Sequence, residues 1–227
     1  MSRGRRLVAA GVCAAACVLS ASTVRAQSAD DRGRMEVSVG VMWTGAISLG
    51  TVAATEPSPS GPFTLFSTST ELAAAPGVEA RIGVRLTPVL EVEASSSYGR
   101  PQLRTAITGD AENGAPTTAS DTLQQYTIDG AAVINVTRWR IAGRATPFVL
   151  AGAGYMRQLH EGNTLVVPGQ TYFAGGGIKY LLRARAHGLK GIGIRADARA
   201  LMRRNGVAFD SSIRTSPVVA ASLFVRF

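Results

Sequence analysis

Charged side chains recur at every second position along several apolar segments of this 227-residue chain. Arg195, Asp197 and Arg199 alternate with isoleucine and alanine, and Glu91 and Glu93 alternate with leucine, valine and alanine in the same way. Residues two apart on an extended strand point to the same side, so these charges share one face. The set holds six acids and six bases: Glu36, Glu79, Glu91, Glu93, Asp129, Asp197, Arg81, Arg85, Lys179, Arg195, Arg199 and Arg226.

This balance of charge allows two kinds of chemistry. A buried charge is costly unless an opposite charge and hydrogen bonds compensate it, so six acids facing six bases suit a packed ion-pair network. The same side chains would also suit the lining of a narrow polar path for solutes. We predict the packed network and keep the conducting path as the alternative.

Catalytic candidates are few, because the chain has only two histidines, His160 and His187. A hydrolytic site needs a histidine close to a serine and a carboxylate, or a pair of carboxylates. Glu161 follows His160 directly, and a separate loop-like stretch that carries Asp210 and Ser211 can approach it after folding. His187 lies in a short turn without a serine beside it. We predict no enzyme activity, no cofactor and no bound metal.

Residues 1–26 have the layout of a secretory signal peptide. Three arginines precede the apolar run 7–19, which is too short to span a bilayer as a helix, and small residues follow it. We expect cleavage after Ala26, which leaves 27–34 as a periplasmic amino-terminal segment. Lipid attachment at Cys17 and twin-arginine export remain alternatives. Both cysteines of the chain fall inside this signal, so the mature chain needs no disulfide.

The charge of the chain argues against a nucleic-acid partner. The formal net charge of +9 falls when the four arginines of the signal leave, and 20 basic side chains then face 15 acidic ones. Nucleic-acid recognition requires basic residues clustered on one face with aromatic partners, and we find no such motif.

The positions that follow residue 35 show an apolar period of two, which indicates β-strands. This pattern defines eight segments: 35–45, 77–86, 89–98, 122–136, 146–157, 170–183, 191–202 and 216–227. Long and short connections alternate between them, and the long ones, read as flexible loops, are 46–76, 99–121, 158–169 and 203–215. Long loops are therefore expected at one rim of the sheet and tight turns at the other.

The aromatic residues show which solvent meets the apolar face. A soluble β-sandwich would also alternate, but it would place its large rings in the middle of the strands, where they bury most area. Here the rings lie near both ends of the strands, as in the two interfacial girdles of a membrane barrel. The girdle residues are Trp43, Tyr98, Tyr126, Tyr155 and Tyr172 near the long loops, and Trp139, Phe148, Tyr180 and Phe227 near the short turns.

A bilayer permits no open sheet edge, because unpaired backbone groups would have no water to bond. The first strand must therefore pair with the last one. We predict an all-β fold, an eight-stranded antiparallel up-and-down transmembrane β-barrel over 35–227, with both chain ends at the periplasmic rim. In this arrangement Phe227 ends the closing strand in the inner girdle.

Several motifs of the second half resemble the small outer-membrane β-barrel domain family related to the OmpA barrel. These motifs are Thr146-Pro147-Phe148 with the run 151–155, the glycines 175–177 before Ile178-Lys179-Tyr180, the charged strand 195–199 and the final Phe227. The resemblance implies an eight-stranded barrel in the outer membrane of a Gram-negative-type bacterium. It also implies contact with outer-membrane lipid and with an assembly machinery that reads the carboxy-terminal strand. No residues follow Phe227, so we expect no periplasmic peptidoglycan-binding domain.

Function is expected in the lumen and in the long loops. An eight-stranded barrel is just wide enough for its own side chains, so we predict a packed polar lumen in a monomer with a structural or surface-interaction role. The long loops are candidates for binding an extracellular ligand. The alternatives are a narrow channel for small or apolar solutes and a lipid A-modifying barrel enzyme.

Overall fold

The computed structural model describes residues 34–227 except 60, 110, 112–114, 140, 142–143, 161–165, 185–188 and 207–211. The predicted signal peptide and most of the segment 27–34 lie outside the described residues, as does His187. The described part belongs to one compact unit that begins at Arg32. It contains no helix that is both long and apolar enough to cross a membrane.

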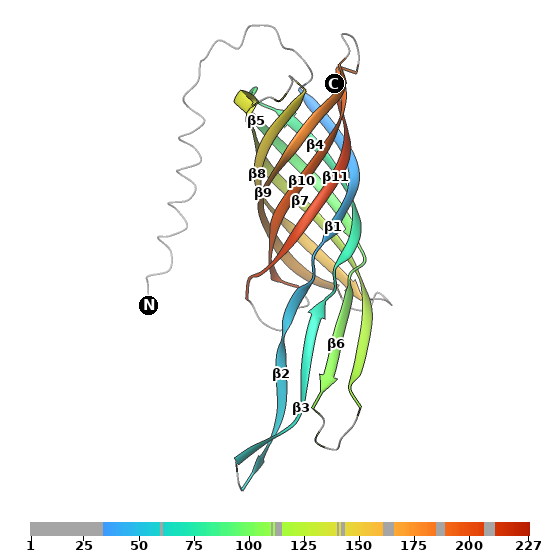
Figure 1. Ribbon diagram of the computed structural model, residues 1–227, viewed down its shortest axis with the longest axis vertical. Coiled ribbons are helices and arrows are strands. Elements are labelled where there is room, and N and C mark those ends of the chain that lie inside the picture. The colour runs from blue at the N-terminus through green and yellow to red at the C-terminus, as the bar shows by residue number, and fades with distance from the viewer. Residues whose placement is uncertain are drawn as a thin grey trace, which may run out of the picture. The chain divides into compact units, whose positions relative to one another are not determined.

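Eight antiparallel strands close into a barrel (Figure 1). Each strand pairs with the next around the wall, and the last pairs back to the first. The predicted eight-stranded antiparallel barrel, with its first strand closed against its last, is therefore confirmed. In order around the wall the strands are β1 (Met35–Thr44), β4 (Ala75–Arg85), β5 (Leu90–Gly99), β7 (Thr117–Asn135), β8 (Ala145–His160), β9 (Val166–Ala184), β10 (Gly191–Asn205) and β11 (Arg214–Arg226).

The alternation of side chains sorts the wall into two faces. In β10 the side chain of Ile194 is 42% exposed, whereas that of Arg195 is 1% exposed. An aliphatic side chain that is exposed on a wall strand is one that points outward. The apolar phase of each strand thus covers the outside, and the charged phase points into the lumen, as the period-two pattern predicts.

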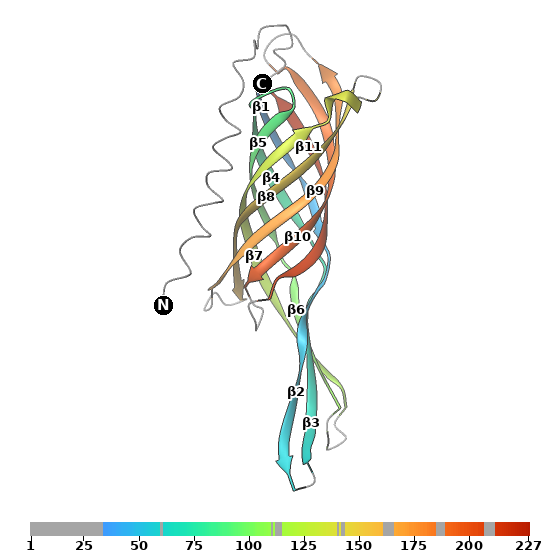
Figure 2. The same cartoon turned by 90° about the vertical axis from the view of Figure 1, so that its left-hand side faces the viewer.

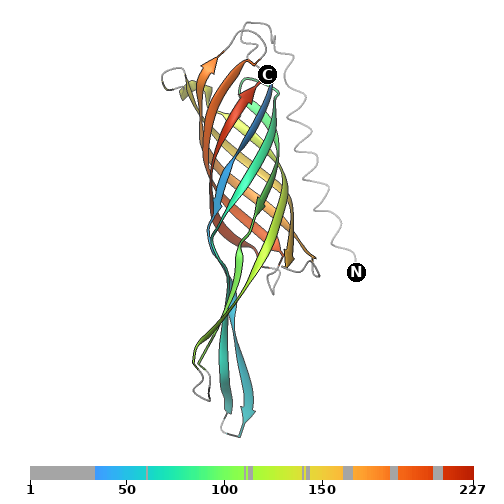
Figure 3. The same ribbon diagram turned by 90° about the vertical axis from the view of Figure 1, so that its right-hand side faces the viewer.

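The long connections 46–76 and 99–121 are not flexible loops, and this part of the prediction was wrong. They form β2 (Ile47–Ser58), β3 (Gly61–Leu72) and β6 (Gln102–Thr108), which join the first half of β7 in a second sheet of order β2-β3-β6-β7. This external sheet projects beyond one rim of the barrel in all three views (Figures 1, 2 and 3). Threonine and alternating apolar residues favour strands here, although glycine, proline and serine gave the stretch a loop-like composition.

The external sheet continues one side of the barrel wall. Its strands β2, β3 and β6 follow or precede β1, β4 and β5 with only two residues between them, and β7 runs through both sheets. A hydrophobic cluster lies at this junction, where Ile47, Leu49 and Leu72 pack with the fully buried Leu123. Pro101 helps to separate the two sheets, because proline has no amide hydrogen for a ladder, while its carbonyl accepts a bond from Leu123.

The opposite rim has tight turns. Between β4 and β5, Thr87 accepts a hydrogen bond on its hydroxyl oxygen from the amide of Leu90 at 2.8 Å. A short 3-10 helix, η1 (Thr137–Trp139), follows β7 at the same rim. Met35 and Phe227 exchange backbone hydrogen bonds, so both ends of the described chain meet there. We call this the short-turn rim and the other the sheet rim.

Candidate functional site

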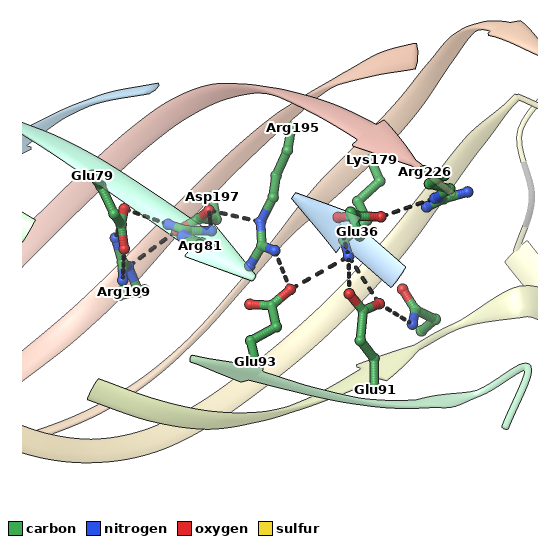
Figure 4. Close-up of polar contacts among 11 residues, drawn as sticks. Glu36, Glu79, Arg81, Glu91, Glu93, Lys179, Arg195, Asp197, Arg199 and Arg226 are labelled. Carbon is green, nitrogen blue, oxygen red and sulfur yellow. Dashed lines mark hydrogen bonds and ion pairs between the residues drawn. The ribbon is translucent and has the colours of Figure 1, made fainter. Parts of the chain in front are cut away.

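The centre of the lumen contains a chain of buried ion pairs (Figure 4). Arg81 of β4 donates to Glu79 at 2.6 Å and, across the lumen, to Asp197 of β10 at 2.8 Å. Asp197 also accepts from Nε of Arg195 at 3.2 Å, and Nη1 of Arg195 pairs with Glu93. These contacts join strands that are not neighbours in the wall, so they brace the barrel from inside.

A second part of the network is centred on one ammonium group. Nζ of Lys179 lies 2.7 Å from Oε1 of Glu36, 2.9 Å from Oε2 of Glu91 and 3.4 Å from Oε1 of Glu93. The carboxylates of these three glutamates lie within 4.8 Å of one another, close enough to ligate a metal ion. Lys179 already supplies a positive charge between them. The cluster is therefore a lysine-centred knot in which no metal is needed to balance the acids.

The two ends of the chain of ion pairs are closed by arginines. Arg199 of β10 pairs with Glu79 at 2.8 Å and with Asp197 at 3.0 Å. Toward the short-turn rim, Nε of Arg226 donates to Glu36 at 2.9 Å. Ten of the twelve predicted lumen residues thus lie in one connected set: Glu36, Glu79, Arg81, Glu91, Glu93, Lys179, Arg195, Asp197, Arg199 and Arg226.

The remaining two predicted residues lie at the margins of this set. Asp129 of β7 accepts a 2.6 Å hydrogen bond from the hydroxyl of Thr171. Arg85 is half-buried and follows the lumen-facing phase of β4 at the short-turn rim.

Phenylalanine rings inside the lumen are a feature that the sequence prediction missed. The guanidinium of Arg195 lies 4.4 Å from the centre of the Phe148 ring, and Arg226 stacks on Phe224 at 4.8 Å. Such contacts stabilise a desolvated cation through the negative face of the ring. Phe148 is 2% exposed, so its assignment to the aromatic girdle near the short turns was wrong. Its parity with Gly152 and Gly154 in β8 would have revealed the lumen orientation.

The glycines opposite the network bring strands together. An added Cβ atom on Gly177 would lie 2.2 Å from the carbonyl oxygen of Ala196, and one on Gly154 would lie 2.1 Å from Oδ1 of Asp129. Real side chains do not approach so closely, so neither position accepts even alanine without movement of its neighbours. These glycines let polar groups of the lumen lie against the wall.

The outside of the wall supplies the observation that decides the fold type. Aliphatic side chains stand exposed around the barrel at mid-height, such as Val39 and Ile128 at 63% and 68% exposure, and Leu223 at 58%. A water-soluble barrel would not present a continuous apolar outer surface around a charged interior.

Comparison with solved structures agrees with a barrel that is apolar outside and charged inside. Neisserial surface protein A matches with a TM-score of 0.54 and 13% identity over 85% of this chain and 97% of that protein. OprG, an outer membrane protein of Pseudomonas aeruginosa, matches with a TM-score of 0.51 and 8% identity over 87% and 98%. The chain has the fold of a small outer-membrane β-barrel.

No family model matches the chain, and a search of curated proteins finds no match. The outer-membrane protease OmpT of Escherichia coli also matches, with a TM-score of 0.39 and 7% identity over 88% of this chain and 99% of the protease, too distantly to bear on activity. The predicted eight-stranded outer-membrane fold is confirmed, and the outer membrane as its location follows from the same comparison. The narrower likeness to the OmpA barrel stays a prediction.

The predicted girdle residues other than Phe148 project from the outside of the barrel. Tyr98 and Tyr126 stack with ring centres 4.9 Å apart on neighbouring strands. The others, apart from Tyr98, are 39–72% exposed: Trp43, Tyr126, Trp139, Tyr155, Tyr172, Tyr180 and Phe227. They form a group near the sheet rim and a group near the short-turn rim, which suits two membrane interfaces.

The catalytic candidates are only partly described. Nε2 of His160 lies 3.8 Å from Oδ2 of Asp121 at the sheet rim, a contact that the sequence did not suggest. Glu161, Asp210 and Ser211 lie outside the described residues. The described residues thus contribute a histidine and a carboxylate to this rim.

A further lumen residue, Arg203 of β10, was missed by the sequence prediction. It is 6% exposed and has the same parity as Arg195, Asp197 and Arg199. The predicted strand ended at residue 202, three positions before its end in the structure. The strand continues to Asn205, whose backbone turns at a φ of 63° before Gly206.

Proposed function

We propose that this barrel is a closed membrane anchor that presents the external sheet to the outside of the cell. The observation that supports the proposal is that a lumen filled by side chains and an ordered external sheet occur in the same molecule. The ion-pair network crosses the lumen with side chains that are at most 15% exposed. Three lumen cavities each have only about 20 Å³, which is room for about one or two water molecules.

The external sheet supports a role in surface interaction because both its faces are open. One face carries Val52, Phe66 and Ile107, which are 63%, 37% and 37% exposed. The other carries the cross-strand neighbours Ser69, Thr51 and Ala106. The sheet thus has exposed apolar side chains on one face and small, mostly hydroxyl-bearing side chains on the other. Such surfaces are suited to contact with another macromolecule. We propose that the barrel acts as a monomer in outer-membrane lipid and binds its extracellular ligand through this sheet.

Folding of the barrel would depend on the assembly machinery of the outer membrane acting on β11. The strand ends with alternating outward residues, Val219, Leu223 and Phe227, and it closes the barrel against β1. This proposal assigns to β11 the role that the family resemblance implies for a carboxy-terminal strand.

Three measurements test the proposal. Purified barrel in planar bilayers should give no discrete conductance steps. Since both native cysteines lie in the predicted signal, a single Thr118→Cys variant should react with a membrane-impermeant maleimide on intact cells. Cells that display the barrel should adhere to a panel of immobilised extracellular-matrix proteins better than cells with a shortened hairpin, in which Asn-Gly replaces 55–64.

The alternatives give different results in the same experiments. Steady conductance steps from the purified barrel would favour a channel for small or apolar solutes. Loss of acyl chains from lipid A in cells that express the protein, abolished by His160→Ala, would favour an enzyme. Equal adhesion by the full-length and shortened proteins, both with heat-modifiable migration that reports a folded barrel, would refute the role of the sheet.

A further inference from the structure

The lumen near the sheet rim contains a buried cation that no described residue pairs with. Arg203 is 6% exposed, and its Nε and Nη1 atoms have no hydrogen-bond partner among the described residues. The charges deeper in the lumen balance, six acids against six bases, so Arg203 adds an unbalanced positive charge. A buried, uncompensated guanidinium costs several kcal/mol, and native proteins rarely leave one so.

Two small cavities adjoin this guanidinium. The first is bordered by Thr44, Ser97 and Gln125, and the second by Gln158 and Asn205, with Arg203 in the wall of both. Each has about 20 Å³. No carboxylate among the described residues borders either cavity. Among the described residues, the space next to the Arg203 guanidinium is therefore lined by apolar side chains and by polar groups that carry no negative charge.

Other polar groups nearby add to this electropositive character. Arg214, which pairs with Arg203 in the register of β10 and β11, also borders the second cavity. Ser216, one row deeper on β11, is fully buried, and its hydroxyl has no hydrogen-bond partner among the described atoms. A buried guanidinium with unsatisfied donors next to a small cavity indicates an ion or water that satisfies those donors in solution.

We infer that Arg203 and the adjoining cavities form a binding site for a small monovalent anion of the chloride class. The volumes decide the class, since a cavity of about 10–15 Å³ on this measure accepts one water molecule and a halide is only slightly larger. Water alone fits the space but leaves the charge unbalanced. A phosphate or an organic carboxylate exceeds the space. The anion neutralises Arg203 and links β10 to Gln125 and Gln158, which border the two cavities. These two glutamines are joined by a 3.0 Å hydrogen bond.

The inference predicts that chloride stabilises the folded barrel specifically. In urea titrations of the detergent-solubilised protein, the unfolding midpoint should be higher in sodium chloride than in sodium gluconate at equal ionic strength. Arg203→Gln should remove this difference. Arg204→Gln is the matched control, because Arg204 has the same charge on the neighbouring, exposed position, and it should keep the difference.

A direct measurement covers the case in which Arg203→Gln does not fold. Crystals of the wild-type barrel grown in sodium bromide should show an anomalous scattering peak within hydrogen-bond distance of the Arg203 guanidinium. The inference is overturned if the peak is absent from this position. It is also overturned if the wild-type midpoint is the same in chloride and gluconate, or if Arg203→Gln responds to chloride as the wild type does.

Discussion

Replacement of Lys179 by methionine is the most informative test of the lysine-centred knot. Methionine has a similar length, so the change removes the ammonium while it fills most of the space. The three carboxylates differ in how many compensating partners they keep after this change. Glu36 keeps Arg226 at 2.9 Å, and Glu93 keeps Arg195. Glu91 keeps only the amide of Asn135 at 3.3 Å. The uncompensated charge therefore falls on Glu91, which is 1% exposed.

The size of the effect follows from that burial. Loss of one partner of a buried ion pair costs about 3–5 kcal/mol, because the other charge remains desolvated. We expect Lys179→Met to lower the free energy of unfolding by this amount. The double variant Lys179→Met with Glu91→Gln should recover most of the loss, because it removes the stranded charge as well. Single Glu91→Gln should cost less than Lys179→Met, since Lys179 retains two other carboxylates.

The measurement is a reversible urea titration in detergent or lipid vesicles, followed by tryptophan fluorescence of Trp43 and Trp139. Lys190→Met, at the turn before β10, is the control and should change stability by less than about 1 kcal/mol. A similarly small loss for Lys179→Met, or no recovery in the double variant, would refute the central role of this lysine.

Three other predictions concern the wall and the lumen. Ile194→Arg should cost about 2–4 kcal/mol in a folding titration because it places a charge in the lipid region, whereas Thr118→Arg in the external sheet should cost under about 0.5 kcal/mol; equal losses would contradict the lipid-facing assignment. Phe148→Ala should cost about 3–5 kcal/mol through lost packing and the lost contact with Arg195, and an unchanged urea midpoint would show that the ring is dispensable. Gly177→Val should prevent barrel formation, seen as loss of heat-modifiable migration on a gel, and a normally migrating variant would rule out the close strand approach.

The barrel could be predicted because one physical rule covers all its strands. Alternation has a period of two, and an error of one residue would reverse both faces, so positions such as Ile194 and Arg195 are assigned together. The pairing of charges across the lumen could not be predicted. Arg81 and Asp197 lie 116 positions apart in the chain, and only the shear of the closed wall brings them to the same level.

The errors have separate physical causes. Phe148 was assigned by its place near a strand end, although its parity places it inside. Arg203 was lost because strand ends have weak signals. The external sheet was read as loops because glycine, proline and serine suggest turns. The pairing of β6 with β7, and of β3 with β6, overrides that composition.

The continuity of β7 from the external sheet into the barrel has a mechanical consequence. Tension applied to the start of β7 in the external sheet would run lengthwise along this strand, and its ladder with β8 from Leu123 to Asn135 would bear it in shear. Backbone hydrogen bonds that are loaded in shear share the force and must break together. Hydrogen bonds that are pulled perpendicular to the strands break one at a time. A cell tethered through this sheet would therefore hold against flow until the tether itself detached.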